Sequence, residues 1–172
     1  MEEERWLPIR DIYEVSDQGR VRSIERTATV ARGDRVFSRR YRSRYLKPVV
    51  AGEGGHLCVT LSHGGVYTRA LIHHLVLEAF VGPRPDGTFG LHWDDDPTNN
   101  RLENLRWGTK TDNQDDKVRN GHHHNSNKTH CPNGHEYTEA NTRVTRKANG
   151  RYARRCITCV RRIGRESYRR NR

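Results

Sequence analysis

Short apolar runs alternate with polar positions over roughly the first third of the chain. They occur at residues 6–9, 13–16, 19–24, 46–50 and 56–61, with three glycines between the last two runs. An alternation with a period of two that is bounded by glycine turns predicts short, half-buried β-strands. We therefore expect residues 1–65 to form a small β-rich module.

The pattern changes after residue 65. A strand rich in polar positions is followed by an apolar stretch long enough for a buried helix, and then by a strand, a polar loop, a second strand and a polar helix. Thr109 or Thr111 is the expected N-cap of that last helix. The expected elements are a strand at 66–69, a helix at 71–80, strands ending at His92 and covering 105–107, and a helix at about 110–119.

Composition favours small modules over one large core. The chain has 172 residues, of which only 32% are hydrophobic, and a net charge of +11 with a pI of about 10. A chain this basic is expected to bind a polyanion, and nucleic acid is the best candidate. No apolar run has the length of a membrane span, and the acidic start is unlike a signal peptide. We therefore expect a cytoplasmic protein that does not bind membranes.

Three of the four cysteines lie in the last region, residues 128–172, which follows a linker with three consecutive histidines. Cys131 and His135 are four positions apart, and Cys156 and Cys159 form a C-x-x-C pair. Each pair fits a tight turn that delivers two ligands, so the four predict a closed, structural Zn²⁺ site. His130 is a competing ligand, and two free thiols or a redox pair are the alternatives. Asn149 and Gly150 predict a hairpin between the pairs.

Two segments concentrate arginine. Six arginines and one lysine lie between residues 32 and 47, interleaved with three aromatic residues, and six more arginines lie in the tail at 160–172. Arginine suits phosphate contacts, although a solvated surface loop is the alternative for the first segment. The candidate DNA-binding residues are Arg20, Arg22, Arg39, Arg40, Arg42, Arg44, Arg161 and Arg162.

The stretch LHWDDDPTNNRLENLRW, residues 91–107, concentrates acids and amides in a basic chain. Hydrolysis of a phosphodiester needs an activated water and usually a divalent cation. A neutral histidine such as His92 can accept the proton from water, and amide or carboxylate oxygens suit Mg²⁺. The same acids and amides also make a good loop by bonding to nearby backbone amides, and we assign Asp96, Asn99 and Asn100 to that structural role.

The series His92, Asn104 and Asn113, within HWDDDPTNNRLENLRWGTKTDN, resembles the HNH branch of the His-Me finger nucleases, most closely the phage and intron-encoded homing type. Residues 72–80 match the helix that usually precedes that motif. The N-terminal residues resemble a modular DNA-binding domain, and CPNGH…CITC resembles a zinc-ribbon-like extension. The resemblance implies an α+β protein with three modules. These are a β-rich DNA-binding domain at 1–65, a ββα-metal HNH nuclease domain at 66–120 and a zinc-binding module with a basic tail at 128–172.

The resemblance implies catalytic and metal-binding roles for three residues. His92 would be the general base, Asn104 would hold the His92 imidazole, and Asn113 would bind one Mg²⁺ or Mn²⁺. Leu91 departs from the pattern, because many relatives have a metal-binding aspartate there. One of the aspartates 94–96, with Asp94 as the main candidate, or His73 or His74 could replace it; otherwise the chain binds metal weakly or is inactive.

The expected function is a metal-dependent DNA endonuclease that nicks or cuts double-stranded DNA. A catalytically weak or inactive DNA-binding protein of the same family is the alternative, and a zinc-stabilised protein-interaction module is a third hypothesis. The expected partner is double-stranded DNA, bound by a monomer or weak dimer. The expected setting is the cytoplasm of a bacterial host, with the gene carried by a phage.

Overall fold

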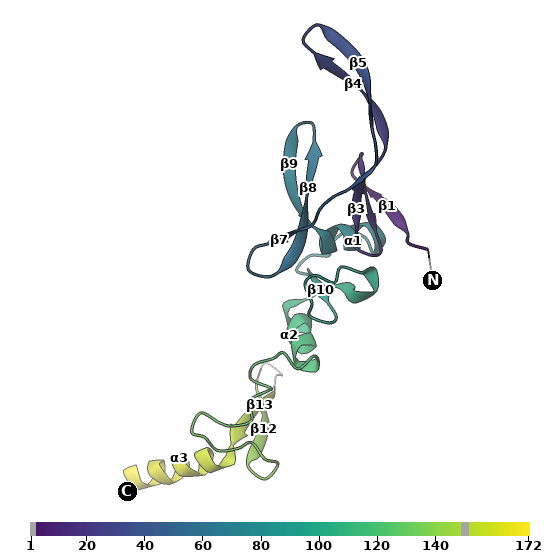
Figure 1. The fold of residues 1–172 in the computed structure, drawn as a ribbon. Helices are drawn as coiled ribbons and strands as arrows, with labels where there is room; N and C mark the ends of the chain where they lie inside the picture. The colour runs from purple at the N-terminus through teal and green to yellow at the C-terminus, as the bar shows by residue number, and fades with distance from the viewer. Residues whose placement is uncertain (1–2, 149–151) are drawn as a thin grey trace. The chain divides into compact units, whose positions relative to one another are not determined.

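The computed structural model describes residues 3–148 and 152–172. The chain forms two compact units, Met1–Asn120 and Gly121–Arg172, which are drawn in Figure 1 and are described separately below. Small antiparallel sheets and α-helices occur in both, so the expected α+β class is confirmed. None of the helices within the described ranges has the length and apolar character needed to cross a membrane.

The first unit begins with a four-stranded antiparallel sheet in the order β1-β2-β3-β6. Its strands are β1 (Trp6–Ile9), β2 (Tyr13–Ser16), β3 (Val21–Ser23) and β6 (Arg44–Tyr45). Val15 and Val21 are buried between the strands and the rest of the unit. The hydroxyl of Tyr13 accepts a hydrogen bond from the Ser62 N–H at 2.9 Å, which ties this sheet to the next one.

A long hairpin, β4 (Arg26–Arg32) and β5 (Arg35–Tyr41), was not predicted as strands. Within the described part of the chain, its two strands pair only with each other. Almost every side chain on it is exposed or half-exposed, and Phe37 is 43% exposed. The hairpin has no buried face, so its sequence lacks the apolar alternation that would have revealed it.

The second sheet has the order β7-β8-β9 and leads directly into the first helix. These elements are β7 (Val49–Ala51), β8 (His56–His63), β9 (Val66–Leu71) and α1 (Ile72–Phe80), close to the predicted positions. One hydrophobic cluster joins α1 to the second sheet and to the N-terminal sheet, and it includes Val15, Val59, Leu61, Val76 and Leu77. The domain boundary at residue 65 therefore lies inside one packed unit, and it stays a prediction.

The first unit ends in a hairpin followed by a helix. The hairpin pairs β10 (Phe89–His92) with β11 (Leu105–Gly108), and α2 (Lys110–Arg119) follows. The Thr109 hydroxyl accepts from the Asp112 N–H, and the Asp112 carboxylate accepts from the Thr109 N–H, so the two residues form a capping box. The predicted strand–loop–strand–helix order and the Thr109 cap are both confirmed.

The second unit contains a hairpin and a helix. Strand β12 (Thr142–Arg146) pairs antiparallel with β13 (Tyr152–Cys156), and α3 (Ile157–Arg170) follows at once. The pair of antiparallel strands between the two ligand pairs agrees with the predicted hairpin. The proposed turn residues Asn149 and Gly150 lie outside the described residues.

Candidate functional site

A cleft of about 610 Å³ lies in the first unit, where β8, α1, β10 and α2 meet. Its lining includes two groups that the sequence assigned to catalysis, His92 at the end of β10 and Asn113 on α2. It also includes His56, His73 and Asp95. The predicted base and the predicted metal ligand therefore face the same solvent-filled space.

The hairpin places His92 at the cleft wall. The next residue, Trp93, donates its backbone N–H to the Asn104 carbonyl at 2.9 Å, which closes the loop between the strands. The His92 side chain is only 6% exposed. Burial lowers the pKa of His92, although a hydrogen bond to Asn100 acts in the opposite direction. The imidazole is therefore neutral near pH 7, the form that can accept a proton.

The amide next to the His92 ring belongs to Asn100 rather than to Asn104. The Oδ1 atom of Asn100 lies 3.4 Å from His92 Nε2, and its Nδ2 donates to the Thr98 carbonyl at 3.1 Å. The Asn104 amide instead donates to Asp94 Oδ1 and to the Asn99 carbonyl, both at 2.9 Å. Asn104 thus holds the loop, whereas Asn100, which we assigned to the loop alone, also contacts the ring.

The Asp94 carboxylate accepts hydrogen bonds from other residues of the same loop. Its Oδ1 accepts from the Asp96 N–H and from Asn104, and its Oδ2 accepts from Asn99 at 2.7 Å. Desolvation acts to raise the pKa of Asp94, but these hydrogen bonds together lower it below its ordinary value. Of the three consecutive aspartates, Asp95 is the one that lines the cleft.

Helix α2 is fixed to the hairpin by a buried ion pair. Asp116, whose side chain is 3% exposed, accepts from Arg106 of β11 at 2.6 Å and from Arg119 at 2.7 Å. On this anchored helix, Lys110, Asn113 and Lys117 line the cleft. Residues at these spacings share one face of a helix. Asn113 is therefore held on the cleft together with two cations.

His92 also packs against two other histidines, His56 of β8 and His73 of α1. The ring centroids of His56 and His73 are 4.8 Å apart, and those of His73 and His92 are 5.1 Å apart. Burial, and to a lesser degree the neighbouring histidines, lowers the pKa of His73 to about 3. His74, the other helix candidate, packs against His73 with ring centroids 4.6 Å apart. No motif indicated His56, which lies outside the HNH-like stretch and 36 positions before His92.

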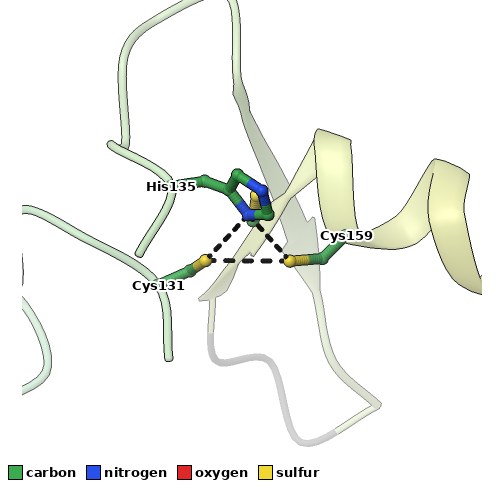
Figure 2. A group of neighbouring side chains, drawn as sticks. Cys131, His135 and Cys159 are labelled. Carbon is green, nitrogen blue, oxygen red and sulfur yellow. Dashed lines mark hydrogen bonds between the residues drawn. The ribbon is translucent and has the colours of Figure 1, made fainter. Parts of the chain in front are cut away.

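The second unit brings together Cys131, His135, Cys156 and Cys159, and their ligand atoms all lie within 4.8 Å of one another. Figure 2 shows three of them. The sulfur atoms of Cys131 and Cys159 are 3.7 Å apart, and His135 Nδ1 lies 3.4 Å from the first and 3.3 Å from the second. Ligands in a tetrahedral zinc site with Zn–S bonds near 2.3 Å are about 3.5–3.8 Å apart. This group could therefore hold a metal ion, and His130 is not part of it.

Asn141 supports this cluster, a role that the sequence did not indicate. Its Nδ2 lies 3.5 Å from the Cys156 sulfur and donates to the Glu136 carbonyl at 2.6 Å. Its Oδ1 accepts from the backbone and the hydroxyl of Thr158, at the start of α3. One amide thus connects the first pair of ligands to the second, as outer-shell partners of metal sites commonly do.

The candidate DNA-binding arginines are divided among several surfaces. Arg20, Arg22 and Arg40 each form an ion pair, with Glu4, Glu14 and Glu25 respectively. The Arg40–Glu25 pair is solvent-exposed, and exposed pairs contribute little free energy. The remaining candidates are Arg39 on β5, Arg42 after it, Arg44 on β6, and Arg161 and Arg162 on α3.

Comparison with known proteins agrees with the motifs. Residues 70–115 match a family model described as HNH endonuclease, and residues 4–62 match the NUMOD4 motif. A protein of Acanthamoeba polyphaga mimivirus named as an uncharacterized HNH endonuclease is 32% identical over 84 residues, which are 49% of this chain and 25% of that protein. The chain thus spans about a quarter of that relative's length.

A solved structure is also similar. It is that of the HNH homing endonuclease I-HmuI, from work on its DNA binding and cleavage, with a TM-score of 0.52 and 20% sequence identity. The match covers 91% of this chain and 80% of that one, and it supports the fold. The chain is therefore similar to the HNH endonuclease family over residues 70–115 and to the NUMOD4 motif over residues 4–62.

Proposed function

We propose that this protein is a metal-dependent DNA endonuclease that hydrolyses phosphodiester bonds. One observation carries the proposal. His92 and Asn113 line the same cleft, and both lie within residues 70–115, which match the HNH endonuclease model. The names of the mimivirus relative and of the homing endonuclease point to the same chemistry. The net charge of +11 suits a DNA substrate.

His92 is the proposed general base. Its neutral imidazole faces the cleft and would accept the proton of the attacking water. Asn100 would position the ring directly, through the contact at 3.4 Å. Asn104 would act indirectly, because its amide holds the loop and its carbonyl binds the residue that follows His92. Both asparagines are therefore positioning residues.

Asn113 is the proposed ligand of one Mg²⁺ or Mn²⁺. Its amide oxygen is a suitable donor for a hard cation, and it faces the cleft from a capped and anchored helix. When bound, such a cation would stabilise charge on the leaving oxygen. Lys110 and Lys117 flank Asn113 and would attract the phosphate. Among the carboxylates proposed to replace the ligand missing at Leu91, Asp95 fits better than Asp94, because it lines the cleft.

The remaining surfaces would hold the DNA. The arginine-rich β4–β5 hairpin and the basic face of α3 offer cations to phosphates, and the Cys131–His135–Cys156–Cys159 group would hold a structural Zn²⁺. Double-stranded DNA is the proposed substrate, bound by a monomer or weak dimer. The proposed setting is a phage gene that acts in the bacterial cytoplasm, and the viral source of the mimivirus relative agrees with a viral gene only.

A plasmid-nicking assay tests the proposal. Wild type should convert supercoiled plasmid to nicked or linear DNA with Mg²⁺ or Mn²⁺. His92→Ala should lose at least about 100-fold in rate, the usual contribution of a general base, while its DNA affinity stays unchanged. His63→Ala, an exposed histidine on β8, is the matched control and should cleave normally. If wild type leaves the plasmid intact with every divalent cation, the inactive DNA-binding alternative, which Leu91 favours, replaces this proposal.

A further inference from the structure

The three histidines beside the cleft come from separate elements: His56 from β8, His73 from α1 and His92 from β10. Each offers one ring nitrogen such that all three nitrogens lie within 4.8 Å of one another. His73 is 3% exposed and His92 is 6% exposed. Within the described residues, this is the one group besides the cysteine site that could hold a metal through three or more side chains.

The packing around these rings leaves hydrogen-bonding capacity unused. The Nδ1 atoms of His56 and His73 are buried, and neither has a hydrogen-bond partner among the described residues. A buried polar atom without a partner normally costs free energy, so such an atom calls for an explanation. Gly90, which lies on β10, leaves room for the His73 ring, because a Cβ on Gly90 would lie 2.6 Å from His73 Cδ2. The fold thus brings the His73 ring close to the strand that ends in His92.

We propose that His56, His73 and His92 form a three-imidazole site for a borderline-soft divalent cation such as Zn²⁺, and that Zn²⁺ bound there blocks cleavage. Imidazole suits Zn²⁺, whereas Mg²⁺ prefers oxygen ligands, so the two cations would occupy different parts of the cleft. Zn²⁺ on His92 would remove the lone pair that accepts a proton from water. The inhibitory effect rests on the proposed function, but the binding itself does not.

The geometry needs only a small adjustment. Nitrogens in a tetrahedral zinc site with Zn–N bonds near 2.0–2.1 Å are about 3.4 Å apart. The separation of up to 4.8 Å would therefore have to close by about 1.4 Å or less, which ring rotation can supply. Three protein ligands leave a fourth position open to water. The competing explanation is that three neutral rings simply pack together, and it predicts no zinc affinity.

Calorimetry on the full chain tests the binding. Protein loaded with one equivalent of Zn²⁺, which fills the cysteine site, is titrated with further ZnCl₂. Wild type should bind one more equivalent. His56→Gln should lose affinity for it by more than the 10–100-fold that outer-shell changes typically cost. His63→Gln, on the same strand and exposed, should behave as wild type. No second equivalent in wild type, or unchanged affinity in a His56→Gln variant with native circular dichroism, would overturn the site.

The cleavage assay tests the consequence separately. With saturating Mg²⁺, added Zn²⁺ should slow nicking by wild type and by His63→Gln at concentrations that match the second calorimetric site. The rate of His56→Gln, normalised to its own zinc-free rate, should fall only at concentrations at least about 10-fold higher. Equal inhibition of all three proteins would overturn the proposed block. Failure of the nuclease proposal would appear as absent cleavage without zinc, and it would leave the calorimetric result intact.

Discussion

The buried carboxylate of Asp116 offers a sharp test of how helix α2 is held. Asp116→Asn keeps the shape of the side chain but removes its charge. In the native fold, this carboxylate accepts hydrogen bonds from Arg106 at 2.6 Å and from Arg119 at 2.7 Å, and its side chain is 3% exposed. The substitution therefore weakens the connection between β11 and α2 and leaves two guanidinium groups without their counter-charge.

The expected loss of stability depends on how exposed the Arg106 and Arg119 side chains are. Breaking a fully buried ion pair costs about 3–5 kcal/mol. Here the Arg106 and Arg119 side chains are 26% and 47% exposed, so water can solvate both after the change. The asparagine oxygen also still accepts one hydrogen bond. We therefore expect a loss of about 2–3 kcal/mol, close to the cost of losing hydrogen bonds to a charged group.

Urea unfolding followed by tryptophan fluorescence is the suitable measurement, because all three tryptophans, at positions 6, 93 and 107, lie in the first unit. With a slope of about 1.5 kcal/mol per M urea, the midpoint should fall by about 1.3–2 M. Asp115→Asn changes the same charge at the exposed neighbouring position and should shift the midpoint by less than about 0.3 M. Equal midpoints for the two variants would refute the anchoring role of Asp116.

Three further predictions concern other parts of the chain. The pKa of His73 is near 6.5 when unfolded and about 3 when folded, so the unfolded chain binds more protons between these values. With chelator present, the free energy of unfolding should therefore fall as the pH drops below 6.5, and His73 should contribute at most about 1.4 kcal/mol per pH unit. Urea titrations at several pH values measure this slope, which should be flatter in His73→Gln. Gly19→Ala should destabilise the first unit by about 2 kcal/mol or more, because φ is +75° and the new Cβ would lie 2.7 Å from Asn100. Gly33→Ala, with φ at +60° and nothing within 4 Å, should cost about 1–2 kcal/mol in the same assay, and equal losses would exclude the clash. Cys156→Ser should remove Zn²⁺ measured by mass spectrometry and unfold the second unit, while the tryptophan transition stays in place; retained zinc would contradict the assigned ligand.

The features that could be predicted from sequence are those that depend on neighbours along the chain. The Thr109 cap, helix α2 and the pairing of β10 with β11 follow from local patterns, and the structure contains all of them. The clustering of Cys131 with His135, and of Cys156 with Cys159, was predictable for the same reason, since each pair is only three or four positions apart in the sequence. In these segments, local preference and final fold agree.

The features that were missed depend on packing between distant segments. His56 reaches His92 only because β8 and β10 both pack near α1, and no spacing in the sequence records that contact. The choice between Asn100 and Asn104 depends on the path of a loop in which several side chains compete for the same backbone groups. The β4–β5 hairpin was missed because exposed strands carry no apolar pattern.

Leu91 illustrates how the cleft could work without the usual aspartate. Its side chain is 4% exposed, and its Cδ1 lies 2.5 Å from where a Cβ on Gly108 would be, so the leucine fills the space between the strands. A carboxylate in this buried position would need a cation beside it at all times, because an unpaired buried charge is costly. Leucine places no buried charge there, so this position does not itself need a bound cation. In the proposed mechanism, metal binding would then depend on groups that have other roles. Asn113 belongs to a capped helix, Asp95 belongs to the loop, and His92 would be the general base as well as a member of the three-histidine group. A cleft of this kind should therefore respond to which divalent cation is present.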